Sequence, residues 1–106
     1  MYRFRTVQVT GVEPPGDVPS TFGLDQNYPN PFNPATMIGY QLPVSGKVSI
    51  VVYDMLGQEV ERLVDEVQPA GRHAVPWNGS NRASGMYIVR MTAGSFTATK
   101  RMVLVK

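Results

Sequence analysis

Short runs of alternating apolar and polar residues fill the chain from residue 36 onward, with turn residues between them at intervals of about 8–12 residues. Alternation with a period of two is typical of strands that bury one face. The 106 residues suffice for one domain, and they are too few for a doubly wound nucleotide-binding fold. The pattern therefore predicts an all-β sandwich or small barrel of six or seven strands, without a substantial helix.

The predicted strands can be placed by their flanking turns. One segment, residues 52–64, is ambiguous, because Val60, Leu63, Val64 and Val67 recur at helical spacing. The β-branched content and Gly57 favour a hairpin over that helix, with a reverse turn at residues 54–57. The strands are expected at residues 36–42, 47–53, 58–64, 72–77, 86–92 and 96–105.

The first 25 residues differ from the rest. Residues 1–10 alternate like a strand, either the end strand of an upstream domain or an extra edge strand of the downstream one. Residues 11–25 are rich in Pro and Gly and are expected to form a flexible linker. The domain itself is expected over residues 26–106.

Charge is unevenly distributed along the chain. Residues 1–66 carry four basic and all eight acidic side chains, whereas residues 67–106 carry six basic and no acidic ones. The basic residues are scattered through strand-like sequence rather than clustered, which argues against nucleic-acid binding. No apolar run is long enough to span a membrane as a helix, so stable membrane insertion is not expected.

No constellation typical of an enzyme is found. His73 is the only histidine, and its alternation with Val75 and Trp77 indicates a structural role. Glu59 and Glu61 are expected on one solvated face of a hairpin. With no cysteine, no calcium loop and no phosphate-binding glycine loop, we expect no catalytic residue, metal or cofactor.

The aromatic residues allow two interpretations. Tyr40, Trp77 and Tyr87 are expected to fill the core, where large rings supply much of the buried area. The alternative is a carbohydrate-binding or adhesion surface, which would require these rings to be exposed.

An unusual segment precedes the first of these strands. It has three prolines, which fix φ and bias the preceding residues toward extended conformation, and asparagines able to bond to nearby backbone. We expect Tyr28 and Phe32 to anchor this stiff loop to the end of the sandwich. The segment, called the box below, comprises Asn27, Tyr28, Pro29, Asn30, Pro31, Phe32, Asn33 and Pro34.

Five stretches in order resemble the type IX (Por) secretion system C-terminal sorting domain: NYPNPFNPATMIGYQLP, KVSIVVYDMLGQEVERLV, PAGRHAVPWNG, ASGMYIVRM and the terminal KRMVLVK. The middle also resembles the Ig-like domain of flagellar hook-capping proteins. The resemblance implies an Ig-like antiparallel β-sandwich of about seven short strands. Two departures, Asn78 where Asp is common and Met37 where Thr is usual, bear only on local stability.

The resemblance further implies a non-catalytic secretion signal that directs an upstream cargo protein through the periplasm and across the outer membrane. The implied partners are the type IX translocon and a sortase-like surface peptidase, with the cargo secreted or held at the cell surface. The alternative is an Ig-like adhesion or carbohydrate-binding accessory module. The residues implied in translocon recognition are Gly85, Tyr87, Lys100, Arg101, Met102, Val103, Leu104, Val105 and Lys106.

These residues suggest a physical hypothesis for recognition. The last strand is expected at or near a sheet edge, where its backbone groups would pair with a receptor strand. Lys100, Arg101 and Lys106 would steer it toward an acidic surface.

Overall fold

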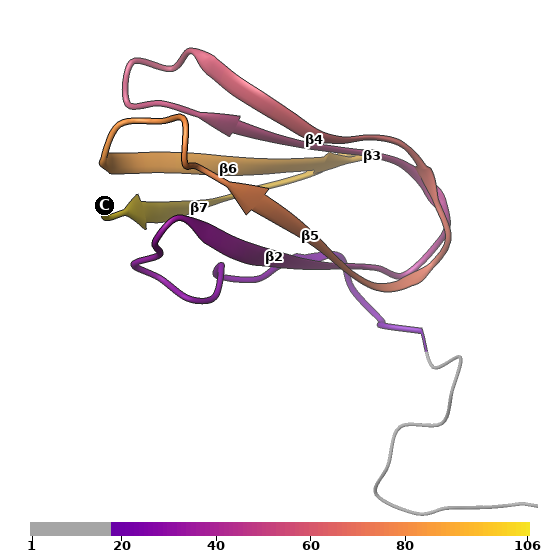
Figure 1. The fold of residues 1–106 in the computed structure, drawn as a ribbon. Helices are drawn as coiled ribbons and strands as arrows, with labels where there is room; N and C mark the ends of the chain where they lie inside the picture. The colour runs from indigo at the N-terminus through magenta and orange to yellow at the C-terminus, as the bar shows by residue number, and fades with distance from the viewer. Residues whose placement is uncertain (1–17) are drawn as a thin grey trace, which may run out of the picture.

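Seven strands and no helix make up residues 18–106, the part of the chain that the computed structural model describes. They form two antiparallel sheets packed face to face, with strand orders β1-β2-β5 and β4-β3-β6-β7 (Figure 1). This confirms the predicted all-β fold, an Ig-like sandwich. The expected strand at residues 1–10 and most of the expected linker lie outside the described residues. The strands are β1 (Gly23–Leu24), β2 (Ala35–Leu42), β3 (Gly46–Tyr53), β4 (Glu59–Gln68), β5 (Gly71–Asn78), β6 (Gly85–Ala93) and β7 (Phe96–Leu104).

The core consists of the inward-facing residues of both sheets, because alternate side chains of a strand point to opposite faces. Trp77, Tyr40 and Tyr87 are all buried there, as predicted. Burial of these three rings removes them from any carbohydrate-binding surface. The fully buried side chains also include Phe32, Ile38, Leu42, Val48, Ile50, Val52, Val89, Met91, Met102 and Leu104.

Two register shifts in β4 explain its ambiguous sequence pattern. Leu63 has no partner on β3, because its neighbours Arg62 and Val64 pair with consecutive residues there. Val60 is skipped in the same way. Each extra residue resets the alternation, so apolar side chains at helical spacing still reach the core from a strand. Residues 59–68 therefore form the strand that the β-branched content predicted.

The same shifts separate two carboxylates that were expected on one face. Glu61 pairs with Val52 and Glu59 with Tyr53, and consecutive residues of β3 point to opposite faces. The Glu61 carboxylate accepts a hydrogen bond of 3.1 Å from the indole N–H of Trp77. The prediction of one shared face is therefore wrong, although both side chains are exposed as predicted. Glu61 satisfies the polar atom of a buried ring.

The predicted reverse turn joins β3 to β4. Asp54 Oδ1 accepts hydrogen bonds from the backbone N–H groups of Leu56 at 2.9 Å and Gln58 at 3.0 Å. Gly57 has a φ of 83°, which a residue with a side chain adopts only at a cost. Local polar bonds and one glycine thus fix this hairpin.

Residues just before the box pack against the sandwich. Gly23 and Leu24 form β1 and pair with Gln41 and Tyr40 of β2. The ring of Phe22 stacks on that of Phe96 at a centroid distance of 5.3 Å. The structure departs here from the sequence analysis, which assigned these residues to a flexible linker, because the strand is too short to produce an alternation signal.

Candidate functional site

β7 carries the terminal segment, Lys100–Lys106, along the border of the four-stranded sheet. Met102 and Leu104 point inward and are fully buried, whereas Lys100 and Val103 are half-buried. The side chains of Arg101, Val105 and Lys106 are exposed. Of the seven expected recognition residues in this segment, only those with exposed atoms are available to a partner while the fold is intact.

The box lies directly against this strand, although the two are more than 70 residues apart (Figure 1). The backbone N–H of Phe32 donates to the carbonyl of Val103, and the N–H of Val105 donates to the carbonyl of Phe32, both at 2.9 Å. Asn30 Oδ1 accepts the N–H of Val103 at 3.0 Å. These bonds close the outer edge of β7 along its last residues, in the parallel bridge between Phe32 and Leu104.

A buried polar network gives the box its shape. The side chain of Asn27, only 2% exposed, donates through Nδ2 to the carbonyl of Pro29 at 3.0 Å and to Thr36 Oγ1 at 2.9 Å. Thr36 Oγ1 itself donates to the Pro29 carbonyl at 2.9 Å. Gln26 links the network to β7, because its Nε2 donates to Asn27 Oδ1 at 2.8 Å and to the Arg101 carbonyl at 2.5 Å. The asparagine thus bonds to local backbone, as predicted.

An aromatic cluster packs the box against the core of the sandwich. The ring of Phe32 lies 5.5 Å from that of Trp77, which meets Tyr87 edge-on at 5.3 Å. Gly79 lies beside them, and a Cβ there would come within 3.0 Å of Leu104 Cδ2. The box, β5, β6 and β7 therefore converge on one tightly packed end of the sandwich.

Gly85 and Tyr87, the other expected recognition residues, belong to β6 next to β7. Gly85 begins the strand with a φ of 151°, outside the usual range of residues with side chains. The hydroxyl of Tyr87 donates to the carbonyl of Ala83 at 2.7 Å, which holds the preceding loop. Both residues are placed to support β7, and the ring of Tyr87 is almost wholly inside the core.

The last residue is tied to that loop. Lys106 Nζ donates to the carbonyl of Ser80 at 2.6 Å, and the Lys106 N–H donates to Ser84 Oγ at 3.1 Å. The end of the chain is therefore held by backbone and side-chain bonds on both sides of β7.

The match to a family model decides the identity. Residues 26–106 match the model of the secretion system C-terminal sorting domain. The chain belongs to this family, the C-terminal sorting domains of type IX secretion. A search of the curated proteins finds no match to it.

The sorting domain uses its box differently from the prediction in one respect. Phe32 is an anchor as expected, but Tyr28 is 81% exposed and is not one. Tyr28 exchanges two backbone hydrogen bonds with Met37 of β2, each 3.0 Å, so its main chain rather than its ring is fixed. The second anchor is Asn27, whose burial the sequence signalled only through its place in the box.

Four contributors to this end of the sorting domain were missed from sequence. Gln26 and Thr36 flank the box, and Ser80 and Ser84 lie in a polar loop. Their residue types resemble those of surface residues, and the contacts of Gln26, Ser80 and Ser84 with Arg101 and Lys106 join segments that are distant in sequence. Asn78, one of the two departures from the family pattern, accepts the Ser80 N–H at 2.8 Å, and Met37, the other, is half exposed on β2.

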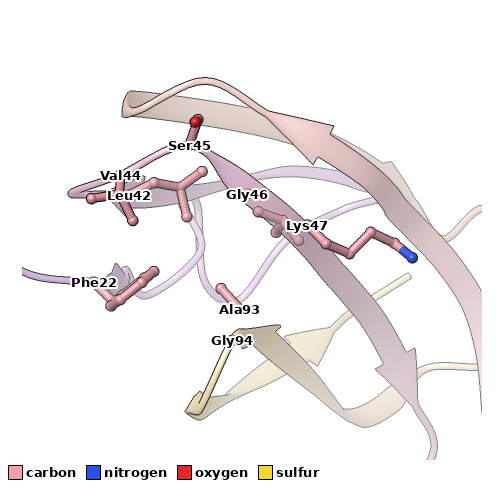
Figure 2. Close-up of a pocket in the computed structure, with 9 residues that line it drawn as sticks. Phe22, Leu42, Val44, Ser45, Gly46, Lys47, Ala93 and Gly94 are labelled. Atoms are coloured by element: carbon pink, nitrogen blue, oxygen red, sulfur yellow. The ribbon is translucent and has the colours of Figure 1, made fainter.

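The opposite end of the sorting domain carries an apolar hollow instead of a polar network. An apolar hollow of about 200 Å³ lies between the β2–β3 and β6–β7 turns, lined by Phe22, Leu42, Val44 and Ala93 among others (Figure 2). The ammonium group of Lys47 points away from it and pairs with Asp65 at 3.3 Å. Few polar groups line the hollow, so it offers no set of converging donors and acceptors typical of a sugar site.

The hydroxyl of Tyr40 is hydrogen-bonded to the side chain of Gln68. Burial raises the pKa of its hydroxyl, a hydrogen bond with Gln68 opposes this, and the charge of Glu66 adds to the rise. The ring stacks on His73 at 5.2 Å. Residues 18–106 contain neither a cluster of His, Asp and Glu suited to a metal nor a helix long and apolar enough to cross a membrane.

Proposed function

We propose that this sorting domain directs an upstream cargo protein across the outer membrane by presenting its terminal segment to the type IX translocon. The cargo would pass through the periplasm and be secreted or held at the cell surface, where a sortase-like peptidase would act on it. The domain supplies recognition only, and the proposal gives it no catalytic residue.

The observation that carries the proposal is the position of two basic side chains, Arg101 and Lys106. Both are exposed at a terminus whose backbone is fixed by the box and by the polar loop. No acidic residue occurs in residues 67–106, so their charge is not offset along this part of the chain. Fixed cationic groups on a rigid strand suit recognition by an acidic surface, because little conformational freedom is lost on binding.

The buried residues of the terminal segment dictate how the proposal must be tested. Deletion of residues 100–106 would remove Met102 and Leu104 from the core, and loss of export could then result from unfolding alone. Arg101→Glu and Lys106→Glu change exposed side chains and leave the core intact, although Lys106→Glu also removes the bond from Nζ to the Ser80 carbonyl. Arg72→Glu, at an exposed position on β5 in the other sheet, is a matched control, because it reverses a charge and removes a polar contact, the 2.6 Å bond from Arg72 Nη1 to Gln41 Oε1.

The experiment fuses the complete chain to a reporter in a bacterium that has the type IX system, and measures reporter outside the cell. We expect a several-fold loss of export for the double variant Arg101→Glu/Lys106→Glu and normal export for Arg72→Glu, with equal thermal stability. Unchanged export by the folded double variant would contradict recognition through these charges.

A further inference from the structure

At every second residue of β7, the backbone N–H and C=O point away from β6, in the plane of the sheet. In an antiparallel pair, residues alternate between those bonded to the partner strand and those whose N–H and C=O point away. The N–H and C=O of Val103 point away from β6, because they bond to the box. The register between β6 and β7 is continuous from Leu104 to Phe96, so Thr97, Thr99 and Arg101 share this outward orientation.

Only part of that edge is covered. The Arg101 carbonyl is bonded to Gln26, and the N–H and C=O of Val103 and the N–H of Val105 are bonded to the box. Within residues 18–106, by contrast, the outward backbone groups of Thr97 and Thr99 and the N–H of Arg101 have no hydrogen-bond partner. We call the stretch Thr97–Arg101 the open edge. It covers five residues between the Phe22–Phe96 stack and the box, and β1 of the other sheet lies near it without pairing with it.

The other two long edge strands, β4 and β5, are protected against pairing with a further strand. β4 carries two register shifts and several charged side chains, and both features discourage pairing with another strand. β5 carries Pro76, which has no N–H to offer. The open edge has neither a shift nor a proline, so it is the straight, regular template that a further strand requires.

Charge selects the kind of strand that would bind. Arg101 lies on the open edge with an exposed side chain, and the half-buried Lys100 precedes it. Arg90 of β6 pairs with Thr99, but its guanidinium is directed to Tyr53 of β3, 2.8 Å from the hydroxyl and 4.9 Å from the ring centroid. Among residues 18–106, no salt bridge offsets the charge of Arg101. Asp25 lies over Gly39 of β2, and Asp54 is bonded within its own turn. A second copy added at this edge would bring a second set of these cations, and like charges disfavour that pairing.

We propose that the open edge binds an extended strand with acidic side chains, contributed by a partner protein, which extends the four-stranded sheet. The partner's role as a receptor rests on the proposed sorting function, whereas the edge and its preference rest on geometry and charge alone. The incoming strand would bond to Thr97, Thr99 and the Arg101 N–H, and an acidic residue of that strand would face Arg101. Recognition would thus combine the open edge with the charged terminus beyond it.

The test uses a synthetic peptide, acetyl-Glu-Val-Thr-Val-Thr-Val-Glu-amide, and its counterpart with lysine in place of both glutamates. Binding to the complete chain is followed by amide chemical shifts and hydrogen exchange. Thr99→Pro removes one outward N–H without breaking the ladder to β6. Ala74→Pro is the matched control, because Ala74 occupies the equivalent outward position on β5, two residues from Pro76.

The acidic peptide should slow exchange at Thr97, Thr99 and Arg101, and Thr99→Pro should weaken its binding roughly threefold to tenfold, the effect of one hydrogen bond. Ala74→Pro should bind normally, and the lysine peptide should bind more weakly. The proposal is overturned if neither peptide protects these amides, if both bind equally, or if protection arises at high protein concentration without peptide, which would indicate a second copy.

The same variants separate this proposal from the sorting function. If Arg101→Glu lowers export while the acidic peptide fails to bind, the open-edge proposal is wrong and the sorting function stands. If the peptide binds as expected but Thr99→Pro leaves export unchanged, the assignment of the partner as a secretion receptor is wrong.

Discussion

The two halves of β7 belong to one continuous strand but differ in what they contact. From the Arg101 carbonyl to Val105, Met102 and Leu104 enter the core, and outward backbone groups are bonded to Gln26, Asn30 and Phe32. From Thr97 to Thr99, the outward groups face no described partner. The sorting domain thus fixes the terminal half of β7 through the box and, within residues 18–106, leaves the outward backbone groups of the preceding half unpaired. A strand that is recognised by pairing needs both a fixed backbone and unpaired groups, and β7 provides them in different halves.

The largest expected effect comes from the core side of the covered half. Leu104→Ala removes a fully buried side chain that packs against Gly79, and it should lower the free energy of unfolding by about 2–5 kcal/mol. Val105→Ala, at an exposed neighbour, should change it by less than about 0.5 kcal/mol. Urea denaturation of both variants measures the difference, and similar values for the two would contradict the assignment of Leu104 to the core.

The buried network of the box should have the next largest effect. Asn27→Ala leaves Thr36 Oγ1 and the Pro29 carbonyl short of a donor, so we expect a loss of about 1–3 kcal/mol in the free energy of unfolding. Asn33→Ala, at an exposed position of the same box, is the control and should be nearly neutral. Thermal unfolding of the two variants checks this, and equal melting temperatures would refute the role given to Asn27.

A smaller change should weaken the contrast between the halves of β7. Asn30→Ala removes the acceptor of the Val103 N–H and should cost about 0.5–1.5 kcal/mol. Hydrogen exchange should become faster at Val103 and remain unchanged at Thr99. If Thr99 accelerates equally, the box stabilises the whole strand rather than its terminal half.

The smallest expected effect is a pH dependence of the free energy of unfolding, which should leave the difference between the two halves of β7 unchanged. The pKa of Tyr40 is raised in the folded state, so its contribution to stability is complete below the ordinary pKa of 10.0 and is lost as pH rises through the folded value. The free energy of unfolding should therefore decline above pH 10, and less so in Tyr40→Phe. Denaturation curves at several alkaline pH values measure this, and an identical decline in both proteins would exclude Tyr40 as the cause.

Sequence reasoning succeeded where signals are local. Alternation located six of the strands, and the Asp54–Gly57 turn follows from side-chain bonds and one glycine. The irregular phase around Leu63 even marked a register shift, although it was open to a helical interpretation. Local signals failed for β1, which is too short to alternate, and for Glu61, whose face depends on the shift at Val60.

The candidate site was predictable only in part. The exposed bases and the box could be identified from residue type and order, and the family resemblance joined them. The contact of Asn30 and Phe32 with Val103 could not be predicted from the sequence. The box and β7 are far apart in the chain, and their relative register is set by the packed fold as a whole. The division of β7 into covered and open halves follows from that register, so it too required the structure.

Amide hydrogen exchange along β7 of the complete chain tests the central claim most directly. The account predicts slow exchange at Val103 and Val105, and fast exchange at Thr97, Thr99 and Arg101. Ala98, Lys100 and Met102, whose N–H groups face β6, should exchange slowly throughout and serve as internal controls. Equal protection of Thr99 and Val103 would contradict the account, because it would mean that the strand is either covered or open along its whole length.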